Sequence, residues 1–176
     1  MTARLPHKIA VLCYVYDDAG NVLLLHRRKM PNAGFYSPIG GKLHVDDGEG
    51  PHECALREIR EEIGLDLSYD DVHLSGIVSE CAYESETHWL MFLFEVLRPV
   101  RHDELAWSEF DEGTLEWIPI EQVETLKIPE TDQRVMWPLV QQHRGGGFFM
   151  AHIDCRHPPI AWRVVESWKS RADVVP

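Results

Sequence analysis

Residues 50–65 read GPHECALREIREEIGL, and this stretch decides the fold of the chain. Its apolar residues recur at helical spacing and form one stripe: Ala55, Leu56, Ile59 and Ile63. Gly50 and Pro51 are typical of a helix start, with glycine as the N-cap and proline in the first helical position. Gly64 follows the last apolar residue, where helices often end in a left-handed turn. The pattern therefore predicts an amphipathic helix over residues 51–63.

Three glutamates share one face of this helix. Glu58, Glu61 and Glu62 stand at positions i, i+3 and i+4, which brings their carboxylates close together. Because like charges at this spacing repel one another, a positive partner is expected. Oxygen ligands suit hard divalent cations such as Mg²⁺ or Mn²⁺. On these residues alone, a solvated acidic face with Arg–Glu pairs is an equally good interpretation.

A glycine pair upstream favours the metal interpretation. Gly40 and Gly41 let the backbone approach a ligand closely, one loop before the acidic helix. The combined pattern is Gly41-x7-Glu49-x7-Arg57-Glu58-Ile59-x-Glu61-Glu62-x-Gly64-Leu65. It resembles the Nudix box over residues 41–65, with every fixed residue type present. The first gap is longer than usual by about two residues, between Lys42 and Gly48, and a longer surface loop costs little free energy.

The resemblance implies a fold, a reaction and a cofactor. The fold is the Nudix fold, an α/β arrangement in which a mixed β-sheet is sandwiched between α-helices, formed by a single domain over residues 1–176. The reaction is the hydrolysis of a nucleoside diphosphate linked to another group. The cofactor is Mg²⁺, with Mn²⁺ as the alternative, and the carbonyl of Gly40 is one expected ligand.

The resemblance also implies roles for the charged residues of the box. Glu61 and Glu62 would be the main metal ligands. Glu58 would either bind metal or act as the general base toward the attacking water. Arg57 would orient Glu58, and Glu49 would support the metal site. A metal is also needed on physical grounds, because an acidic pocket cannot bind a pyrophosphate without cations.

The composition excludes several other functions. The 176 residues carry a formal net charge of −12, which argues against binding to a nucleic acid polymer or to an anionic membrane surface. Hydrophobic residues make up 44% of the chain, enough for a sizeable core, yet no apolar run reaches the length of a membrane span. The four cysteines lack the spacing of metal ligands, so we expect reduced thiols. We therefore expect a soluble, cytoplasmic protein that binds a small-molecule nucleotide; the sequence makes no prediction of oligomeric state.

The remaining pattern predicts strands on both sides of the helix. Apolar runs bounded by turn residues predict strands over residues 9–16, 22–26, 73–83, 88–97, 114–118 and 148–153. A second helix is expected from about Thr131 to Gln142, and Pro138 would bend it unless this proline lies near a boundary. The chain is expected to fray after Arg171. This order of elements is typical of one α/β unit with a mixed sheet.

Two segments resemble the base pocket of 8-oxo-dGTP diphosphatases of the MutT type. In the first segment, residues 35–39, Tyr36 would stack on a base and Ser37 would hydrogen-bond the edge of that base. An aromatic ring that covers the core is the alternative for Tyr36.

The second segment precedes the second helix. Asp132 lies where that family places an acid that contacts the purine, and Glu130 is the runner-up. Gln133 occupies the position of a second family acid and departs from the pattern. An N-cap role for Thr131 or Asp132 is an equally good interpretation.

Other charged residues complete the predicted site. Glu112 resembles a loop glutamate that reaches the metal in MutT-type enzymes, and a solvated loop acid is the alternative. Arg27 or Arg28, at the end of the second strand, would meet phosphate oxygens, and strand parity decides which of them faces inward. Lys42, beside the glycine pair, joins the expected substrate-binding residues.

Three hypotheses for the function follow. The first is a metal-dependent pyrophosphohydrolase that converts a nucleoside triphosphate, including an oxidised one, to the monophosphate and pyrophosphate. The second is the same chemistry on a nucleotide sugar, ADP-ribose or a dinucleoside polyphosphate. The third is a nucleotide-binding regulatory module without turnover. The third is disfavoured, because such modules usually lose carboxylates of the box and this chain keeps them all.

Overall fold

The computed structural model describes residues 4–30 and 32–169, so the expected fraying after Arg171 lies outside the described residues. The strands are β1 (His7–Tyr14), β2 (Val22–Arg27), β3 (Tyr36–Ser37), β4 (Val72–Tyr83), β5 (Thr87–Val96), β6 (Glu109–Phe110), β7 (Gly113–Ile118), β8 (Phe148–Asp154) and β9 (Ala161–Trp168). The two α-helices are α1 (Pro51–Ile63) and α2 (Trp137–His143). Short 3-10 helices lie at Val45–Asp47, Tyr69–Asp71, His102–Glu104 and Ile120–Thr125.

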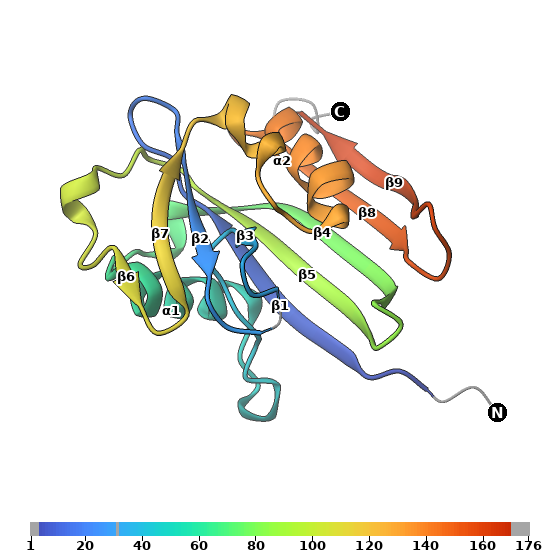
Figure 1. The fold of residues 1–176 in the computed structure, drawn as a ribbon. Helices are drawn as coiled ribbons and strands as arrows, with labels where there is room; N and C mark the ends of the chain where they lie inside the picture. The colour runs from blue at the N-terminus through green and yellow to red at the C-terminus, as the bar shows by residue number, and fades with distance from the viewer. Residues whose placement is uncertain (1–3, 31, 170–176) are drawn as a thin grey trace, which may run out of the picture.

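Two β-sheets carry the fold (Figure 1). The larger sheet has the strand order β1-β5-β4-β8-β9, and it is mixed because β1 runs parallel to β5 and β4 runs parallel to β8. The smaller sheet has the order β3-β2-β7-β6 and is antiparallel. Helix α1 contacts β1, and α2 contacts β4 and β8. The prediction of an α/β fold with a mixed sheet is confirmed.

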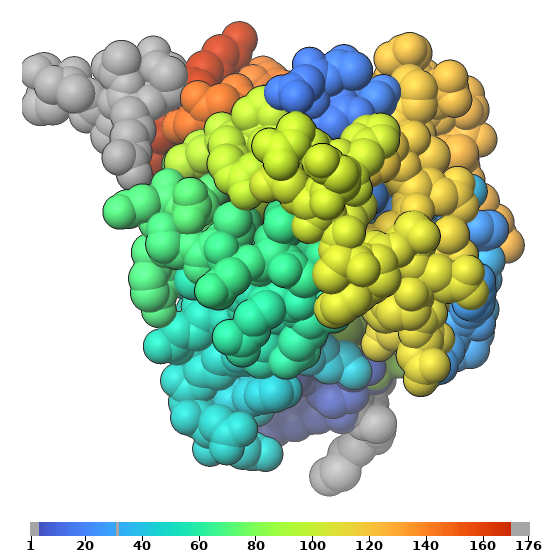
Figure 2. Space-filling model, turned by 90° about the vertical axis from the view of Figure 1, so that its left-hand side faces the viewer, coloured from blue at the N-terminus to red at the C-terminus, as the bar shows by residue number. Residues whose placement is uncertain are grey.

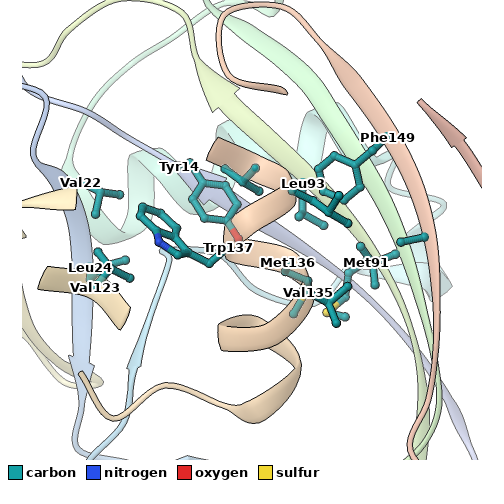
Figure 3. Close-up of a cluster of buried hydrophobic side chains, with 14 of the residues drawn as sticks. Tyr14, Val22, Leu24, Met91, Leu93, Val123, Val135, Met136, Trp137 and Phe149 are labelled. Atoms are coloured by element: carbon teal, nitrogen blue, oxygen red, sulfur yellow. The ribbon is translucent and has the colours of Figure 1, made fainter. Parts of the chain in front are cut away.

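Side-chain alternation along β1 places the two helices on opposite faces of the large sheet. Ala10 and Tyr14 pack in the hydrophobic cluster that includes Trp137 of α2 (Figure 3). Val11 and Cys13 pack in the second cluster, which includes the apolar stripe of α1. Because successive strand residues point to opposite faces, one strand contributes to both cores. The described residues contain no helix long and apolar enough to cross a membrane.

Helix α1 has the boundaries that the sequence predicts, and a distant loop caps its C-terminal end. Gly64 adopts a left-handed conformation (φ 77°), and its N–H donates to the carbonyl of Arg60. The Ala106 N–H donates to the Ile63 carbonyl over 3.0 Å, and the Trp107 indole N–H donates to the Glu62 carbonyl over 2.6 Å. Figure 2 shows this yellow-green segment lying across the surface beside the helix. These bonds satisfy carbonyls that a helix end leaves without intrahelical partners.

The second helix differs from the prediction in its internal geometry. A π-helical turn spans Asp132–Met136 and leads directly into α2. Pro138 lies in the first turn of α2, so the expected condition that it stand near a boundary is met. Proline has no backbone N–H, so one helical hydrogen bond is missing at Pro138. The π-helical turn before it lets the helix continue without that bond.

The sequence did not predict strands β3, β6 and β9, and it predicted β1 two residues too far along the chain. The first strand is His7–Tyr14 and not residues 9–16; Tyr16 forms only an isolated bridge with Val22. β3 and β6 are two residues long, too short to show a period. β9 is largely exposed on both faces, so it lacks the one-sided burial that produces an apolar alternation.

Candidate active site

The acidic face of α1, the glycine pair and the region before α2 line one cleft with a volume of about 630 Å³. This volume falls in the range of small-molecule sites. Glu58, Glu61 and Glu62 line the cleft, and so do Ser37 and Asp132. The fold therefore brings together residues that lie almost 100 positions apart in the chain.

Glu62 is held against the glycine pair. Its Oε2 accepts a hydrogen bond from the Gly40 N–H over 2.9 Å, and its side chain is buried, with 6% of its surface exposed. On either side of Gly40, the carbonyls of Ile39 and Gly41 accept hydrogen bonds from β1, which fixes the glycine pair beneath the helix. Burial raises the pKa of Glu62 to about 8, and the nearby charge of Glu58 acts in the same direction.

Neither Gly40 nor Gly41 can be replaced by a larger residue without a clash, because neighbouring atoms lie too close to each Cα. Gly40 has a φ of 141°, and a Cβ there would overlap the carbonyl oxygen of Val11. A Cβ at Gly41 would overlap the carboxylate of Glu58. The glycine pair thus leaves the space that the acidic face of α1 occupies.

Arg57 connects the acids of the site. Its Nε and Nη2 donate to both carboxylate oxygens of Glu49, over 2.7 and 3.0 Å. Its Nη1 donates to Glu58 Oε1 over 2.6 Å and to Glu61 Oε2 over 3.2 Å, and Nη2 reaches the Lys42 carbonyl over 3.2 Å. Arg57 lowers the pKa of Glu49 to about 2, so that carboxylate stays ionised. The predicted orientation of Glu58 by Arg57 has a matching geometry in these bonds.

The longer loop before α1 does not displace Glu49. Its extra length forms the exposed 3-10 turn Val45–Asp47, which ends at Gly48 in a left-handed conformation (φ 73°). The His44 N–H then donates to Glu49 Oε2 over 2.8 Å. The loop therefore returns to the same carboxylate that Arg57 holds.

The donor set fits a hard divalent cation. The acids that face the cleft supply only oxygen ligands, and the charges of Glu58 and Glu112 both raise the pKa of Glu62. In the described part of the chain, no three such side chains already converge on one point. Arg57 draws Glu58 and Glu61 together, whereas Gly40 holds Glu62. The acids of the cleft outnumber the guanidinium groups of Arg57 and Arg27 beside them, and a bound cation would relieve this excess of negative charge.

The structure distinguishes Arg27, the last residue of β2, from Arg28, which follows the strand. Arg27 lines the cleft, and its Nη2 lies 3.6 Å from Oε2 of Glu112. Arg28 instead pairs with Glu109 over 2.6 Å and donates to the Thr114 hydroxyl over 3.0 Å. Arg27 and Glu112 are thus the members of this group that share the cleft with the acidic face.

Of the two predicted base-pocket residues in β3, Ser37 lines the cleft. Its hydroxyl oxygen is buried, and no hydrogen-bond partner is found for it among the described residues. The Tyr36 ring stacks on His26 with 4.4 Å between ring centroids, and its hydroxyl donates to Glu116 over 3.1 Å. Tyr36 lines a void of about 10 Å³, together with Ser37 and Asp132, which also line the cleft.

Asp132 lines the cleft, as does Thr131, whereas Glu130 and Gln133 do not. Gln133 is exposed and donates to the carbonyl of Glu124, and Glu130 is exposed and pairs with Arg134 over 2.6 Å. No side-chain cap hydrogen bond is present at the start of the π-helical turn. Burial raises the pKa of Asp132 to about 8.

The sequence analysis missed Glu80 of β4. This carboxylate is buried, with 4% of its surface exposed, and it lines the same cleft as Asp132. Its Oε1 has no hydrogen-bond partner among the described residues, and burial raises its pKa to about 7. The signal was available, because Glu80 shares the strand parity of the buried residue Val78.

Comparisons with known proteins agree with this geometry. A family model described as NUDIX domain matches residues 6–140. A MutT protein structure from Bacillus halodurans superposes with a TM-score of 0.70 at 24% identity, covering 90% of this chain and 97% of that one. At this identity the likeness shows the fold alone.

Two curated relatives match shorter stretches. The isopentenyl-diphosphate Delta-isomerase of Mycolicibacterium vanbaalenii is 34% identical over 70 residues, which is 38% of this chain and 37% of that protein. The 8-oxo-dGTP diphosphatase of Proteus vulgaris is 41% identical over 59 residues, which is 33% of this chain and 48% of that protein. Each match therefore spans less than half of the relative's own length.

Proposed function

The chain belongs to the NUDIX domain family, and on that premise we propose that it is a metal-dependent pyrophosphohydrolase of a nucleoside triphosphate, including an oxidised one. The observation that carries the proposal is the shared cleft, in which the acidic face of α1 and the polar residues Ser37 and Asp132 lie within one volume of nucleotide size. The products would be a nucleoside monophosphate and pyrophosphate.

The charged residues have two roles, metal binding and proton transfer. Mg²⁺ or Mn²⁺, held by Glu61, Glu62, Glu58 and the Gly40 carbonyl, would neutralise phosphate oxygens and lower the pKa of an attacking water. Glu58 lines the cleft with its carboxylate held by Arg57, and it would take the proton of the attacking water.

The remaining polar residues bind the substrate. Arg27 and Lys42 line the cleft and supply positive charge to the phosphates. Glu112 is a further oxygen ligand within reach of the same region, beside Arg27. Ser37 and Asp132, which also line the cleft, would contact the base.

A substrate panel tests the proposal. The protein is incubated with Mg²⁺ or Mn²⁺ and with nucleoside triphosphates, 8-oxo-dGTP, nucleotide sugars, ADP-ribose and dinucleoside polyphosphates, with chelated metal as the control. Pyrophosphate released from a triphosphate supports the proposal. Two monophosphate products from a sugar or ribose diphosphate transfer the same chemistry to the second class of substrate. No turnover on the whole panel overturns the proposal in favour of a nucleotide-binding regulatory module.

A further inference from the structure

Strand β9 is an edge strand to which the proposed function gives no role. It ends the five-stranded sheet, pairs with β8 on one side, and has no further strand beyond it in the described part of the chain (Figure 1). The family model matches residues 6–140, and the cleft is lined by no residue of β9. An edge strand presents unpaired backbone N–H and C=O groups, with which another strand can pair.

The opposite edge of the same sheet is covered by the chain itself. Backbone N–H groups of β1 donate to the carbonyls of Ile39 and Gly41, and the Leu43 N–H donates to the Ile9 carbonyl. The edge strands of the smaller sheet, β3 and β6, are two residues long. With eight residues, β9 is therefore the long edge that the described residues leave uncovered.

The side chains of β9 favour strand pairing. Trp162, Val164 and Val165 are 39–55% exposed, and tryptophan and valine are residue types that sheets favour. Proline and lysine, which often protect exposed edges, do not occur within the strand. Charged side chains and β-bulges also protect edges, and β9 has both. Its two charged residues, Arg163 and Glu166, have opposite signs, however, so they repel a second strand only in some registers.

A β-bulge brings these two charges to one face of the sheet. The register pairs Arg163 with His152 and Glu166 with Met150, and one residue of β9 between them is left out of the pairing. Because His152 and Met150 point to the same face, Arg163 and Glu166 do so as well, although they are three positions apart. Among the described residues, neither charge has an ion-pair partner.

This arrangement makes the strand complementary to itself. When two β9 strands pair antiparallel about a two-fold axis perpendicular to the sheet, like faces stay on the same side. Arg163 of one copy can then lie opposite Glu166 of the other, and the same pair recurs across the axis. This register also sets Ala161 opposite Trp168, so that the whole strand overlaps. Opposite charges that face each other across two strands stabilise the pairing.

The β8–β9 hairpin also lacks the acidic excess of the chain. The formal net charge of the chain is −12, whereas residues 148–169 carry three basic and two acidic side chains. Two copies of an acidic chain repel each other, and this repulsion is weaker where the facing surfaces do not share the excess of negative charge. The charge distribution therefore favours an approach through the hairpin.

We propose that β9 is a self-association surface, and that a second copy of this chain pairs with it antiparallel, with Arg163 of each copy opposite Glu166 of the other. The pairing forms a two-fold dimer in which one sheet continues across both copies. It goes beyond the proposed function and does not depend on it, because no residue of β9 lines the cleft.

Sedimentation velocity over a range of protein concentrations tests the inference. Since one pair of strands buries less surface than a standard interface, we expect a dimer with a dissociation constant of about 1–100 µM. Arg163→Glu and Glu166→Arg each place like charges opposite one another at two points of the dimer. Each variant is expected to raise the dissociation constant about 10-fold or more. Arg60→Glu, at an exposed position of α1, changes the net charge as Arg163→Glu does and should dimerise like the native chain.

An equimolar mixture of the two β9 variants tests the register. In a mixed pair, the strand with two acidic side chains faces the strand with two basic ones, so both charge pairs are attractive again. We expect dimers to reappear in the mixture, with a dissociation constant within about threefold of the native value.

Hydrogen exchange of the native chain provides a measurement that needs no variant. Amides within residues 161–168 should be more protected above the dissociation constant than below it, because pairing engages the open edge. A native chain that stays monomeric at every concentration overturns the inference and leaves the edge to a strand of another protein. Single variants that dimerise like the native chain, a mixture that associates no better than its components, or protection of residues 161–168 that is independent of concentration also overturns it.

Discussion

The backbone N–H of Gly40 donates a hydrogen bond to the carboxylate of Glu62, with 2.9 Å between the nitrogen and Oε2. This bond joins the glycine pair to the acidic face of α1 across a loop and most of a helix. An amide oxygen can accept the same bond, so Glu62 can lose its charge without losing its position. Replacing Glu62 by glutamine therefore tests the catalytic role of its charge while the hydrogen bond that positions the side chain is kept.

We expect Glu62→Gln to lower kcat by about 100-fold or more, since metal-held carboxylates stabilise transition-state charge. The thermal midpoint should not fall, because the Gly40 bond persists and the buried carboxyl is replaced by a neutral amide of similar size. Activity assays with Mg²⁺ and calorimetric unfolding measure the two effects. Glu53→Gln, on the exposed side of the same helix, is the control and should retain activity. Full activity in the Glu62 variant would remove this residue from the metal site.

A methyl group at residue 41 provides a steric test. Gly41→Ala places a Cβ where the Glu58 carboxylate lies, so the general base must move away from its position beside Arg57. We expect kcat to fall by about 100-fold, because small displacements of a catalytic group are costly. Gly50→Ala is the control, since a Cβ there meets only the flexible end of Glu53, at 3.1 Å. Equal activity of the two variants would argue that Glu58 is not the base.

Glu80 makes stability depend on pH. Its pKa is about 7 in the folded chain and 4.5 ordinarily, so the folded state holds the proton more tightly. The associated stability is fully present below pH 4.5 and is lost as the pH rises through 7. Glu80→Gln should therefore be more stable than the native chain at pH 9, by at most about 3 kcal/mol, and not at pH 4. Urea unfolding at both pH values measures the difference. Asp132 and Thr131 are the groups that interact with Glu80. If Glu80→Gln raised the free energy of unfolding equally at both pH values, the effect could not come from the titration of Glu80.

The bond from Trp107 to the end of α1 has a measurable contribution. Trp107→Phe removes the indole N–H that donates to the Glu62 carbonyl and should lower the free energy of unfolding by about 1 kcal/mol. Trp162→Phe on β9 is the matched control, because the two indoles are similarly exposed, at 40% and 45%. The urea midpoints of the two variants give the comparison, and an equal loss in both would show that the bond contributes nothing.

The sequence predicted those parts of the site that are local. Helix α1 carries its own start, stripe and stop within 16 residues, so its boundaries need no tertiary information. The bond from Arg57 to Glu61 follows from the helical i,i+4 spacing. The bond from Arg57 to Glu58, its direct neighbour in the chain, was expected from the resemblance and not from the spacing. Glu49, which the resemblance assigns to the support of the metal site, contacts Arg57 despite the longer loop.

Features that depend on pairing between distant strands were harder to predict. The choice between Arg27 and Arg28 required the end of β2, which its partner β7 fixes. The meeting of Glu80 with Asp132 requires β4 and the π-helical turn to lie over the same cleft. β9 shows no alternation, because neither of its faces is buried.

The longer loop before α1 adds residues to the chain without changing the contacts of Arg57 in the site. The turn Val45–Asp47 protrudes from the body of the fold (Figure 1, cyan), while the residues on either side of it return to Arg57. Extra residues are absorbed outward, and the carboxylate at the end of the loop keeps its partner. The turn is therefore a natural attachment point for a fluorophore or an affinity tag, through which the protein can be labelled or immobilised with the cleft intact.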